Sequence, residues 1–365
     1  MGLPLLMGLA GLAAFRPSIL RQVIEKRPVA LGLLLLFMSW AVLSASWSDW
    51  HGTTAFKIAA LFVVGLLFAS AAGANAAAAR LALAAAIAAF LVLALLLAVE
   101  ATQNLALNRA IQPEQPDGEL NRNPSRGLVV MLALVWPGVA WLAAIGGARS
   151  IGLAVAIVLI ATPLSAQFDL LSTAFGFGAG LIAFAVAFAA PAFALRSLTL
   201  GLAGWMLAAP FLTPLLFASQ QLVDAVPLSW AARIGIWRYV CERIMEQPWI
   251  GHGLDAGRAV SDRIEIRGLD MRGTPVHPHS ASLQIWFETG LVGAVLAALV
   301  LGYGGWRLAS AFKHDKFAAA AAAATLAMFG LMANVGWSLW QEWWMATLFL
   351  AAALTAAVAA RGARG

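Results

Sequence analysis

The sequence predicts an all-α polytopic membrane protein of about eleven transmembrane helices, interrupted late in the chain by one long polar loop that contains short helices. Three observations predict this fold class. The 365-residue chain is 62% hydrophobic and only 11% charged, its mean hydropathy is +0.85, and apolar runs of membrane-crossing length recur along it. A soluble chain carries about 25% charged residues, so this little charge could not cover a water-exposed globule.

A helix that crosses a bilayer needs about 20 mostly apolar residues. The runs that predict such helices, the first of them short, lie at 2–15, 29–46, 56–73, 78–99, 127–146, 150–166, 172–193, 197–219, 289–309, 317–335 and 342–360. Their many alanines and scattered glycines favour close helix packing in lipid. We therefore expect an N-terminal bundle of about eight spans over 1–219, a catalytic loop over 220–288, and a C-terminal bundle of about three spans over 289–365.

Basic residues in the short connections orient the predicted bundle. If every second connection faces the cytoplasm, the following residues all lie on that side: Arg16, Arg21, Lys26, Arg27, Arg80, Arg149, Arg196, Arg307, Lys313, Lys316, Arg361 and Arg364. Cytoplasmic loops carry such an excess of Lys and Arg. The chain is therefore expected to lie in a bacterial inner membrane, with a cytoplasmic C-terminus and with the 220–288 loop in the periplasm.

The 220–288 loop is too polar to cross a membrane, because it holds seven arginines and eight acidic residues. Ser229 is a candidate N-cap for a helix over about 230–246, which Pro248 would end. At helical spacing, one apolar stripe expected to face the bundle consists of Ile236, Trp237, Val240 and Ile244. The opposite, solvent-facing side would carry Arg238, Glu242 and Glu246.

Arg233 falls inside the apolar stripe of this predicted helix. An arginine on an apolar face is costly unless it is paired. One interpretation is that Arg233 forms an ion pair with one of the eight loop acids. The other is that it binds an anionic substrate group such as a diphosphate, which a guanidinium holds through parallel hydrogen bonds. Trp237, one turn later, would flank that group.

The sharpest local pattern is His277-Pro278-His279-Ser280, which leads directly into the ninth span. Ser280 is a candidate N-cap, so His279 would lie at a helix N-terminus, where backbone amides favour anions and disfavour an imidazolium. The neutral imidazole could then accept a proton. The alternative for each histidine is a loop residue without a chemical role. No metal site is expected, because a closed zinc site takes four ligands and no further Cys or His has suitable spacing.

These residues resemble the O-antigen ligase family, which shares a superfamily with O-antigen polymerases and protein O-oligosaccharide transferases. The family motif is His, then Asn, Ser or Gln, then nine residues, then Gly-x-x-Gly. Here it reads His279-Ser280, nine residues, Gly290-Leu-Val-Gly293. The family's upstream run of Arg, Trp, Pro and Gly-x-Gly is also matched here, in the same order, by Arg233-x-x-x-Trp237, Pro248 and Gly251-x-Gly253. The motifs cover about 60 residues, and the resemblance implies the multi-span architecture of GT-C-like glycosyltransferases.

One part of the family pattern is missing. Many members carry a Ser-Arg pair at the periplasmic start of a middle span, but here 171–174 reads Leu-Ser-Thr-Ala, with Asp169 nearby. The second phosphate-binding arginine is therefore expected elsewhere. Arg126, at the mouth of the fifth span, is the first candidate, and Arg122 is the second. His277 is a further candidate for contact with the substrate.

The resemblance implies a glycosyltransferase that uses no metal or other cofactor. Its donor would be a polysaccharide on undecaprenyl diphosphate and its acceptor a hydroxyl of the lipid A–core oligosaccharide, both embedded in membrane lipids, with no nucleic acid involved. Arg233 would hold the diphosphate, and His279 would orient or deprotonate the acceptor hydroxyl. Glu288 is a weaker candidate base, since a carboxylate near a helix start is also favoured by the helix dipole. Inversion at the anomeric carbon is expected.

Two other functions are weighed against the ligase. An O-antigen polymerase uses the same chemistry with a lipid-linked repeat as acceptor, but such chains usually carry two long periplasmic loops, and the second-longest connection here, 100–126, has 27 residues. A transporter favours ionisable residues near the middle of the membrane, and the predicted spans have almost none there. The sequence therefore favours the ligase.

Overall fold

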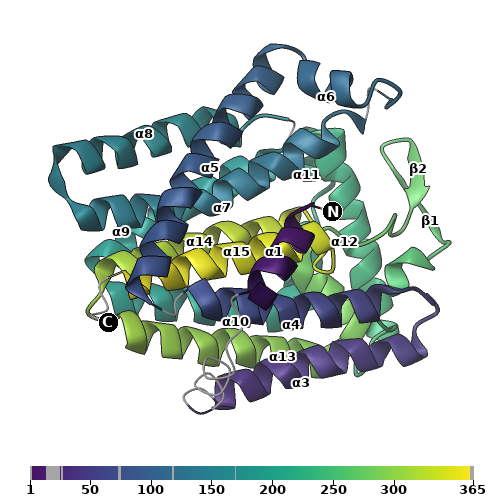
Figure 1. Ribbon diagram of the computed structural model, residues 1–365. Helices are drawn as coiled ribbons and strands as arrows, with labels where there is room; N and C mark the ends of the chain where they lie inside the picture. The colour runs from purple at the N-terminus through teal and green to yellow at the C-terminus, as the bar shows by residue number, and fades with distance from the viewer. Residues whose placement is uncertain are drawn as a thin grey trace.

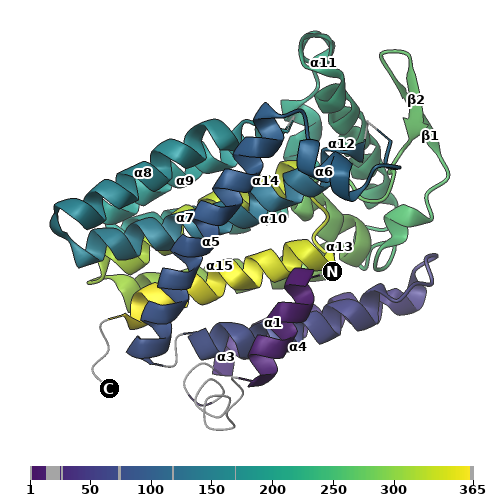
Figure 2. The same cartoon turned by 45° about the horizontal axis from the view of Figure 1, so that its top comes forward.

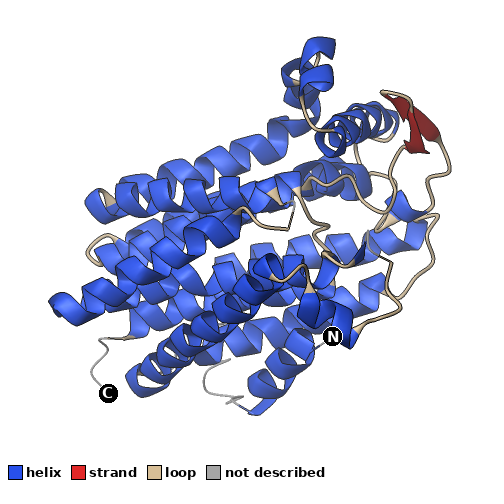
Figure 3. Ribbon diagram, turned by 90° about the horizontal axis from the view of Figure 1, so that it is seen from above, coloured by secondary structure: helices blue, strands red, loops and turns tan. Residues whose placement is uncertain are grey.

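The computed structural model describes residues 2–13, 25, 28–72, 75–116, 119–168 and 170–361. The described chain is a helical bundle with one small two-stranded sheet (Figures 1 and 3). Its α-helices are α1 (Gly2–Ala13), α3 (Pro28–Leu43), α4 (Thr54–Ala72), α5 (Ala76–Thr102), α6 (Ala106–Ile111), α7 (Arg122–Ile145), α8 (Gly147–Ser165), α9 (Leu171–Ala189), α10 (Pro191–Leu216), α11 (Gln220–Ala225), α12 (Leu228–Glu246), α13 (Ala281–Phe312), α14 (Lys316–Val335) and α15 (Glu342–Ala360). Antiparallel strands β1 (Arg263–Ile266) and β2 (Leu269–Arg272) form a hairpin, and two short 3₁₀ helices cover Ser44–Trp47 and Ala256–Arg258.

Ten helices of the described residues are long and apolar enough to cross a membrane. They correspond to the second to eleventh predicted spans, which confirms the all-α polytopic fold class. The first predicted span, 2–15, is represented by α1, of which 12 residues are described. The last two residues of that predicted span lie outside the described residues. The described part of the chain therefore supports ten spans rather than eleven.

The elements outside the predicted spans gather at one end of the bundle. Helices α6, α11 and α12 and the β-hairpin lie at that end, and the C-terminus lies at the other (Figures 1 and 2). At the C-terminal end Arg361 pairs with Asp315 at 2.8 Å, and the Lys316 ammonium lies 4.2 Å from the Phe188 ring centroid. Three connections that the sequence assigns to one side of the membrane therefore meet. The predicted cytoplasmic residues outside the described part of the chain are Arg16, Arg21, Lys26, Arg27 and Arg364.

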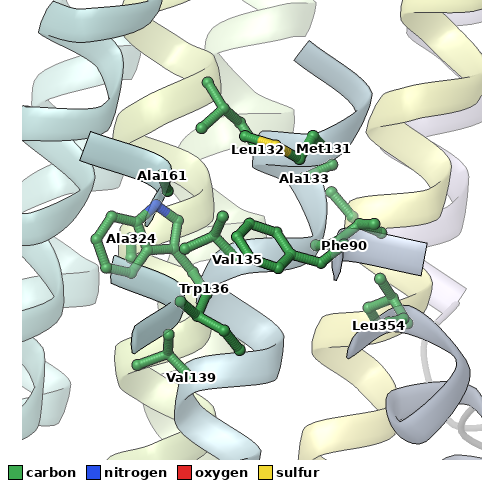
Figure 4. Packing of buried hydrophobic residues seen from close by; sticks show 14 of the residues in the cluster. Phe90, Met131, Leu132, Ala133, Val135, Trp136, Val139, Ala161, Ala324 and Leu354 are labelled. Carbon is green, nitrogen blue, oxygen red and sulfur yellow. The ribbon is translucent and has the colours of Figure 1, made fainter. Parts of the chain in front are cut away.

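The centre of the bundle is built from small residues and one tryptophan. The alanine run 318–324 of α14 is wholly buried, which lets the neighbouring helices α7 and α9 approach closely. The Trp136 ring of α7 stacks on Phe177 of α9 with the ring centroids 5.1 Å apart. Figure 4 shows Trp136 among other buried residues of the same cluster. A Cβ added at Gly180 would lie 2.5 Å from the Trp136 indole nitrogen, so this glycine makes room for the ring.

Helix α12 corrects two predictions and confirms a third. It begins at Leu228, one residue after Pro227, and Ser229 lies in its first turn rather than at the N-cap. The predicted apolar stripe is buried as expected. Arg238, predicted to face solvent, is half-buried instead and donates from Nε to the Phe217 carbonyl at 3.1 Å. This contact makes sense because the last carbonyls of α10 have no partner within their own helix.

The β-hairpin was not predicted. Its alternating Ile264 and Ile266, followed by Arg267-Gly268 with positive φ angles, is the local pattern that indicates a strand pair and a tight turn. Ile266 packs where a side chain at Gly235 of α12 would lie. The hairpin thus covers the outer side of α12 at the loop end of the bundle.

Helix α13 begins eight residues before the predicted start of the ninth span and is interrupted at Gly290, where φ is 64° and ψ is −165°. The 248–253 turn satisfies the main-chain groups that this break frees. Two of its amides donate to α13 carbonyls at 2.7 and 2.8 Å, and two of its carbonyls accept from α13 amides at 2.8 and 3.3 Å. The backbones nearly touch, since a Cβ at Gly251 would lie 2.6 Å from the Glu288 carbonyl carbon. The two glycine motifs, Gly251-x-Gly253 and Gly290-x-x-Gly293, therefore lie in one tight backbone contact, which we call the joint.

Gly290→Ala is expected to destabilise the protein by about 3 kcal/mol or more, because it adds a steric overlap to a backbone conformation that only glycine readily adopts. A Cβ at Gly290 would lie 2.5 Å from the Ile250 amide nitrogen. Gly146 is a matched control, because it has nearly the same backbone angles, φ 73° and ψ −176°, and open space around it. Gly146→Ala should therefore cost only about 1 kcal/mol. Thermal unfolding in detergent measures both, and equal losses would contradict the assignment of the joint.

Candidate active site

The position of His279 is fixed by the helix cap that follows it and by a hydrogen bond of its ring. The Ser280 hydroxyl caps α13 by accepting from the Leu283 amide at 3.4 Å, which confirms the predicted N-cap. His279 itself adopts a left-handed φ of 55°, a conformation that is costly for a non-glycine residue. Its Nδ1 lies 2.6 Å from the Gly336 carbonyl oxygen. Because a carbonyl can only accept, Nδ1 carries the proton and the neutral ring leaves Nε2 as a proton acceptor.

His277 supports the His279 backbone. The His279 amide donates to Nδ1 of His277 at 3.1 Å, and the two ring centroids are 4.3 Å apart. His277 is 7% exposed. This bond satisfies the amide of a strained residue, so a positioning role for His277 follows directly from the geometry.

Arg233 reaches the same region from α12. Trp237, one turn later, donates its indole N–H to the Pro278 carbonyl at 2.8 Å, which ties α12 to the segment between the two histidines. The Arg233 guanidinium lies 5.4 Å from the Trp230 ring centroid and donates to the Ser229 carbonyl at 3.1 Å. Its Nε is buried without a hydrogen-bond partner, and no carboxylate in the described ranges pairs with it. The predicted alternative of an internal ion pair is therefore not observed there.

The positive charge of Arg233 helps to lower the pKa of both imidazoles. Burial, reinforced by Arg233 and opposed by the bond to Gly336, lowers the pKa of His279 to about 4. Burial, then the charges of His279, Arg258 and Arg233, lowers the pKa of His277 well below its usual range. Burial also lowers the pKa of Arg233 itself. Both histidines are thus neutral at pH 7, as predicted for His279, although burial rather than the helix terminus is the main cause.

Glu288 lies away from this group, in a buried network. It is 1% exposed, and its two carboxylate oxygens accept from Gln284 Nε2 at 2.9 Å and from the Trp340 indole N–H. Gln284 Oε1 in turn accepts from the Leu339 amide at 2.9 Å. The network joins α13 to the loop 336–341, whose Gly336 carbonyl holds His279. The geometry gives Glu288 a positioning role and satisfies both of its oxygens.

The two candidates for the second phosphate-binding arginine lie in different surroundings. Arg122 is exposed and paired with Glu119 at 2.9 Å. Arg126 is half-buried, its Nε has no hydrogen-bond partner, and its guanidinium lies 5.7 Å from the Trp343 ring centroid. It lines a pocket of about 490 Å³ that includes neither Arg233 nor His279. Asp169, noted beside the missing Ser-Arg pair, lies outside the described residues.

Comparison with known proteins finds a similar family. Residues 123–298, from the first turn of α7 to the middle of α13, match the family model described as O-antigen ligase. Over this segment the chain is similar to the O-antigen ligase family. The matched segment contains Arg126, Arg233 and both histidines, whereas Arg122 and the loop 336–341 lie outside it.

Curated relatives point the same way. A Rickettsia conorii protein provisionally named a polysaccharide ligase is 27% identical over 230 residues, which are 61% of this chain and 54% of that protein. Proteins of the same provisional name from Rickettsia bellii and Rickettsia typhi are 30% and 28% identical over 124 and 131 residues. Those matches cover 33% and 35% of this chain and 30% and 32% of the relatives. The chain thus spans about half of the first relative and about a third of the others. No solved structure matches it.

Sequence reasoning missed three contributors to the candidate active site. Trp230 stands three residues before Arg233, a spacing that places two side chains together on a helix and is a usable signal. Arg258, whose charge acts on His277, had no distinguishing pattern. The Gly336 carbonyl lies 57 residues from His279, and no local pattern indicates such a contact. Among the described residues, no group of three or more His, Cys, Asp or Glu side chains gathers as metal ligands would.

His252 has a structural explanation. Its Nε2 lies 2.8 Å from the Arg243 carbonyl oxygen, and its ring stacks on Phe287 at 4.7 Å. These contacts secure the 248–253 turn against α12 and α13. The geometry therefore supports a structural role for His252.

The depressed pKa of His279 predicts a loss of stability in acid. From pH 6.5 down to about 4 the unfolded chain binds a proton at this residue and the folded chain does not, so the free energy of unfolding should fall by about 3 kcal/mol. Above pH 6.5 the residue is neutral in both states and its contribution is constant. Thermal unfolding followed between pH 8 and 4 measures the loss. His279→Asn should reduce it, and an unchanged pH dependence in that variant would contradict the assignment.

Proposed function

We propose that this protein transfers a polysaccharide from undecaprenyl diphosphate to a hydroxyl of the lipid A–core oligosaccharide, at the periplasmic face of a bacterial inner membrane. The observation that carries the proposal is an unpaired, half-buried guanidinium, Arg233, close enough to the neutral imidazole of His279 for its charge to lower the pKa of that ring. A cation without a protein partner suits an anionic ligand, and a neutral imidazole suits a proton acceptor. The family match of 123–298 supports chemistry of the ligase or polymerase type.

The proposed reaction is an in-line displacement. The acceptor oxygen attacks the anomeric carbon of the donor, and the bond from that carbon to the diphosphate oxygen breaks with its electron pair leaving on the diphosphate. The acceptor proton passes to Nε2 of His279, and Arg233 stabilises the charge that grows on the leaving group. Attack from the opposite face inverts the anomeric carbon. Diphosphate is already a good leaving group, so the proposal invokes no nucleotide and no metal.

Other residues of the site hold these two groups in place. Trp237 fixes Pro278, and His277 satisfies the His279 amide. Glu288 secures the loop that carries Gly336. Because reacting groups must be held within a fraction of an ångström, such supports contribute to rate without touching the substrate. Arg126 contributes to substrate binding from its own pocket, and Arg122 is the weaker candidate because it already has an acidic partner.

The fate of the lipid carrier in cells tests the proposed function. Deletion of the gene should leave full-length polymer on undecaprenyl diphosphate and lipid A–core without polymer, and a plasmid copy should restore the joined product. Single repeats attached to core after deletion would identify a polymerase instead. Unchanged lipopolysaccharide in the deletion strain, with the parent strain producing polymer, would contradict both.

The proposal also specifies how the chain is oriented in the membrane. It places the 220–288 loop in the periplasm and the C-terminus in the cytoplasm. The support is the shared position of Arg361, Asp315 and Lys316 at the end of the bundle away from α12 and the hairpin (Figure 2). Connections rich in Lys and Arg lie preferentially on the cytoplasmic side of a membrane.

A further inference from the structure

The pocket that contains Arg126 lies beside the candidate active site, not within it. Its volume is about 490 Å³, a size typical of small-ligand sites. It is formed by the N-terminal turns of α4, α7 and α15, by α1, by Asp255 and Arg258, and by part of the loop 336–341. Helix α1 crosses α4 and α15 at this place (Figures 1 and 2).

The loop 336–341 takes part in both the pocket and the His279 contact. At its start, the Gly336 carbonyl holds the His279 ring. Further along, Ser338, Trp340 and Gln341 line the pocket. Arg258 also connects the two places, because it lines the pocket and its charge lowers the pKa of His277. The pocket is therefore linked to the two histidines through the loop 336–341 and through Arg258.

Charge in the pocket is balanced except at Arg126. Lys57 pairs with Glu342 at 2.7 Å, and Arg258 pairs with Asp255 at 2.6 Å. Arg126 has no acidic partner among the described residues, and its Nε is buried without a hydrogen bond. A cation in the second turn of a helix also opposes the helix dipole. Stability alone does not explain this residue, so the pocket presents one free positive charge to a ligand.

The other lining groups suit a saccharide. Trp343 donates its indole N–H to Gln341 Oε1 at 3.0 Å, which fixes the orientation of the ring beside Arg126. Thr54, Asn123 and Gln341 add hydroxyl and amide groups to the lining. An aromatic face with several fixed polar groups binds a sugar ring, and the free guanidinium would bind one acidic substituent on it.

We infer that this pocket binds the acceptor saccharide through an acidic group that Arg126 holds, while Arg233 holds the diphosphate of the donor. The inference rests on the proposed function, because it assigns a second substrate to the same histidine. The two arginines then serve different substrates of the same reaction. This arrangement replaces the expectation that Arg126 and Arg233 grip a single diphosphate.

Kinetics with both substrates varied in turn test the inference. In Arg126→Ala the KM for the acceptor should rise about tenfold or more, because one charge-assisted contact is lost, while the KM for the donor should change less than twofold. Arg126→Lys should recover part of the acceptor affinity. Arg243→Ala is the matched control, because that arginine is also half-buried with an Nε that has no hydrogen bond, but it pairs with Glu246 at 2.8 Å. A rise in the donor KM instead, or no change in either, would overturn the inference.

Direct binding separates this inference from the proposed function. The probe is soluble, deacylated core oligosaccharide, used before and after phosphatase treatment, with tryptophan fluorescence as the readout. The wild type should bind the phosphorylated probe at least tenfold more tightly than the treated probe, and Arg126→Ala should bind both alike. Arg126-dependent binding without any glycan transfer would support the pocket and refute the proposed function. Normal transfer with phosphate-independent binding would refute the pocket alone, and competition by inorganic pyrophosphate through Arg126 would reassign the pocket to the donor.

Discussion

Replacing His279 by alanine is expected to lower the rate of glycan transfer by about 10²–10⁴-fold, the usual contribution of a positioned general base. The reason is the geometry of the ring. Nδ1 is committed to the Gly336 carbonyl, so the neutral imidazole presents Nε2 as its proton acceptor. Transfer of labelled glycan in membranes, normalised to the amount of folded protein, measures the loss.

His279→Asn separates chemistry from folding. Asparagine tolerates the left-handed φ of 55° better than most residues, and its side-chain amide can still donate to a carbonyl, but it is no base at neutral pH. We expect this variant to be as inactive as His279→Ala and to unfold at nearly the wild-type temperature. His277→Ala should lose less activity, because its role is to support the backbone. Wild-type transfer by His279→Asn would remove His279 from the mechanism as a base.

Replacing Arg233 by alanine is expected to lower the transfer rate by about 10²–10³-fold, because one preorganised cation at the leaving group is lost. The same change should leave the stability of the protein equal or higher. The Arg233 guanidinium is half-buried, its Nε has no hydrogen bond, and no acid of the described chain neutralises it. Arg233→Lys should restore only part of the rate, since an ammonium is a point charge without the planar fork of a guanidinium.

Arg238 provides the matched comparison on the same helix. Its guanidinium donates to the Phe217 carbonyl at the end of α10. Arg238→Ala should therefore lower stability by about 1–3 kcal/mol and leave turnover per folded molecule near that of the wild type. A rate measurement with the donor at saturation, paired with thermal unfolding, distinguishes the two arginines. Loss of stability without loss of rate in Arg233→Ala would show that Arg233 is a structural residue.

Much of the helical bundle could be predicted from local patterns in the sequence. Length and hydropathy were sufficient for the ten spans, because the bilayer sets the length of a crossing helix whatever packs against it. The apolar stripe of α12 and the Ser280 cap were also predictable, since both depend on residues within one or two turns of each other. The motif order around Arg233 and His279 added the family, which the match over 123–298 bears out.

The rest depends on contacts between distant segments. Nothing near Gly290 indicates that a turn 40 residues upstream will occupy the break in α13, although the glycines mark where it happens. The partner of His279 Nδ1 is a main-chain carbonyl, and any residue type can supply one. Arg126 could be singled out by its place at a helix mouth, but tertiary packing alone puts it in a pocket that the loop 336–341 lines and Arg233 does not.

Reconstitution of the purified protein with purified substrates tests the central claim most directly. Proteoliposomes would hold undecaprenyl-diphosphate-linked polysaccharide, labelled in the glycan and in the diphosphate, together with lipid A–core. The wild type should release one undecaprenyl diphosphate for each glycan joined to the acceptor, and His279→Asn and Arg233→Ala should release almost none. Equal release and joining by the wild type and both variants, at equal amounts of folded protein, would contradict the account.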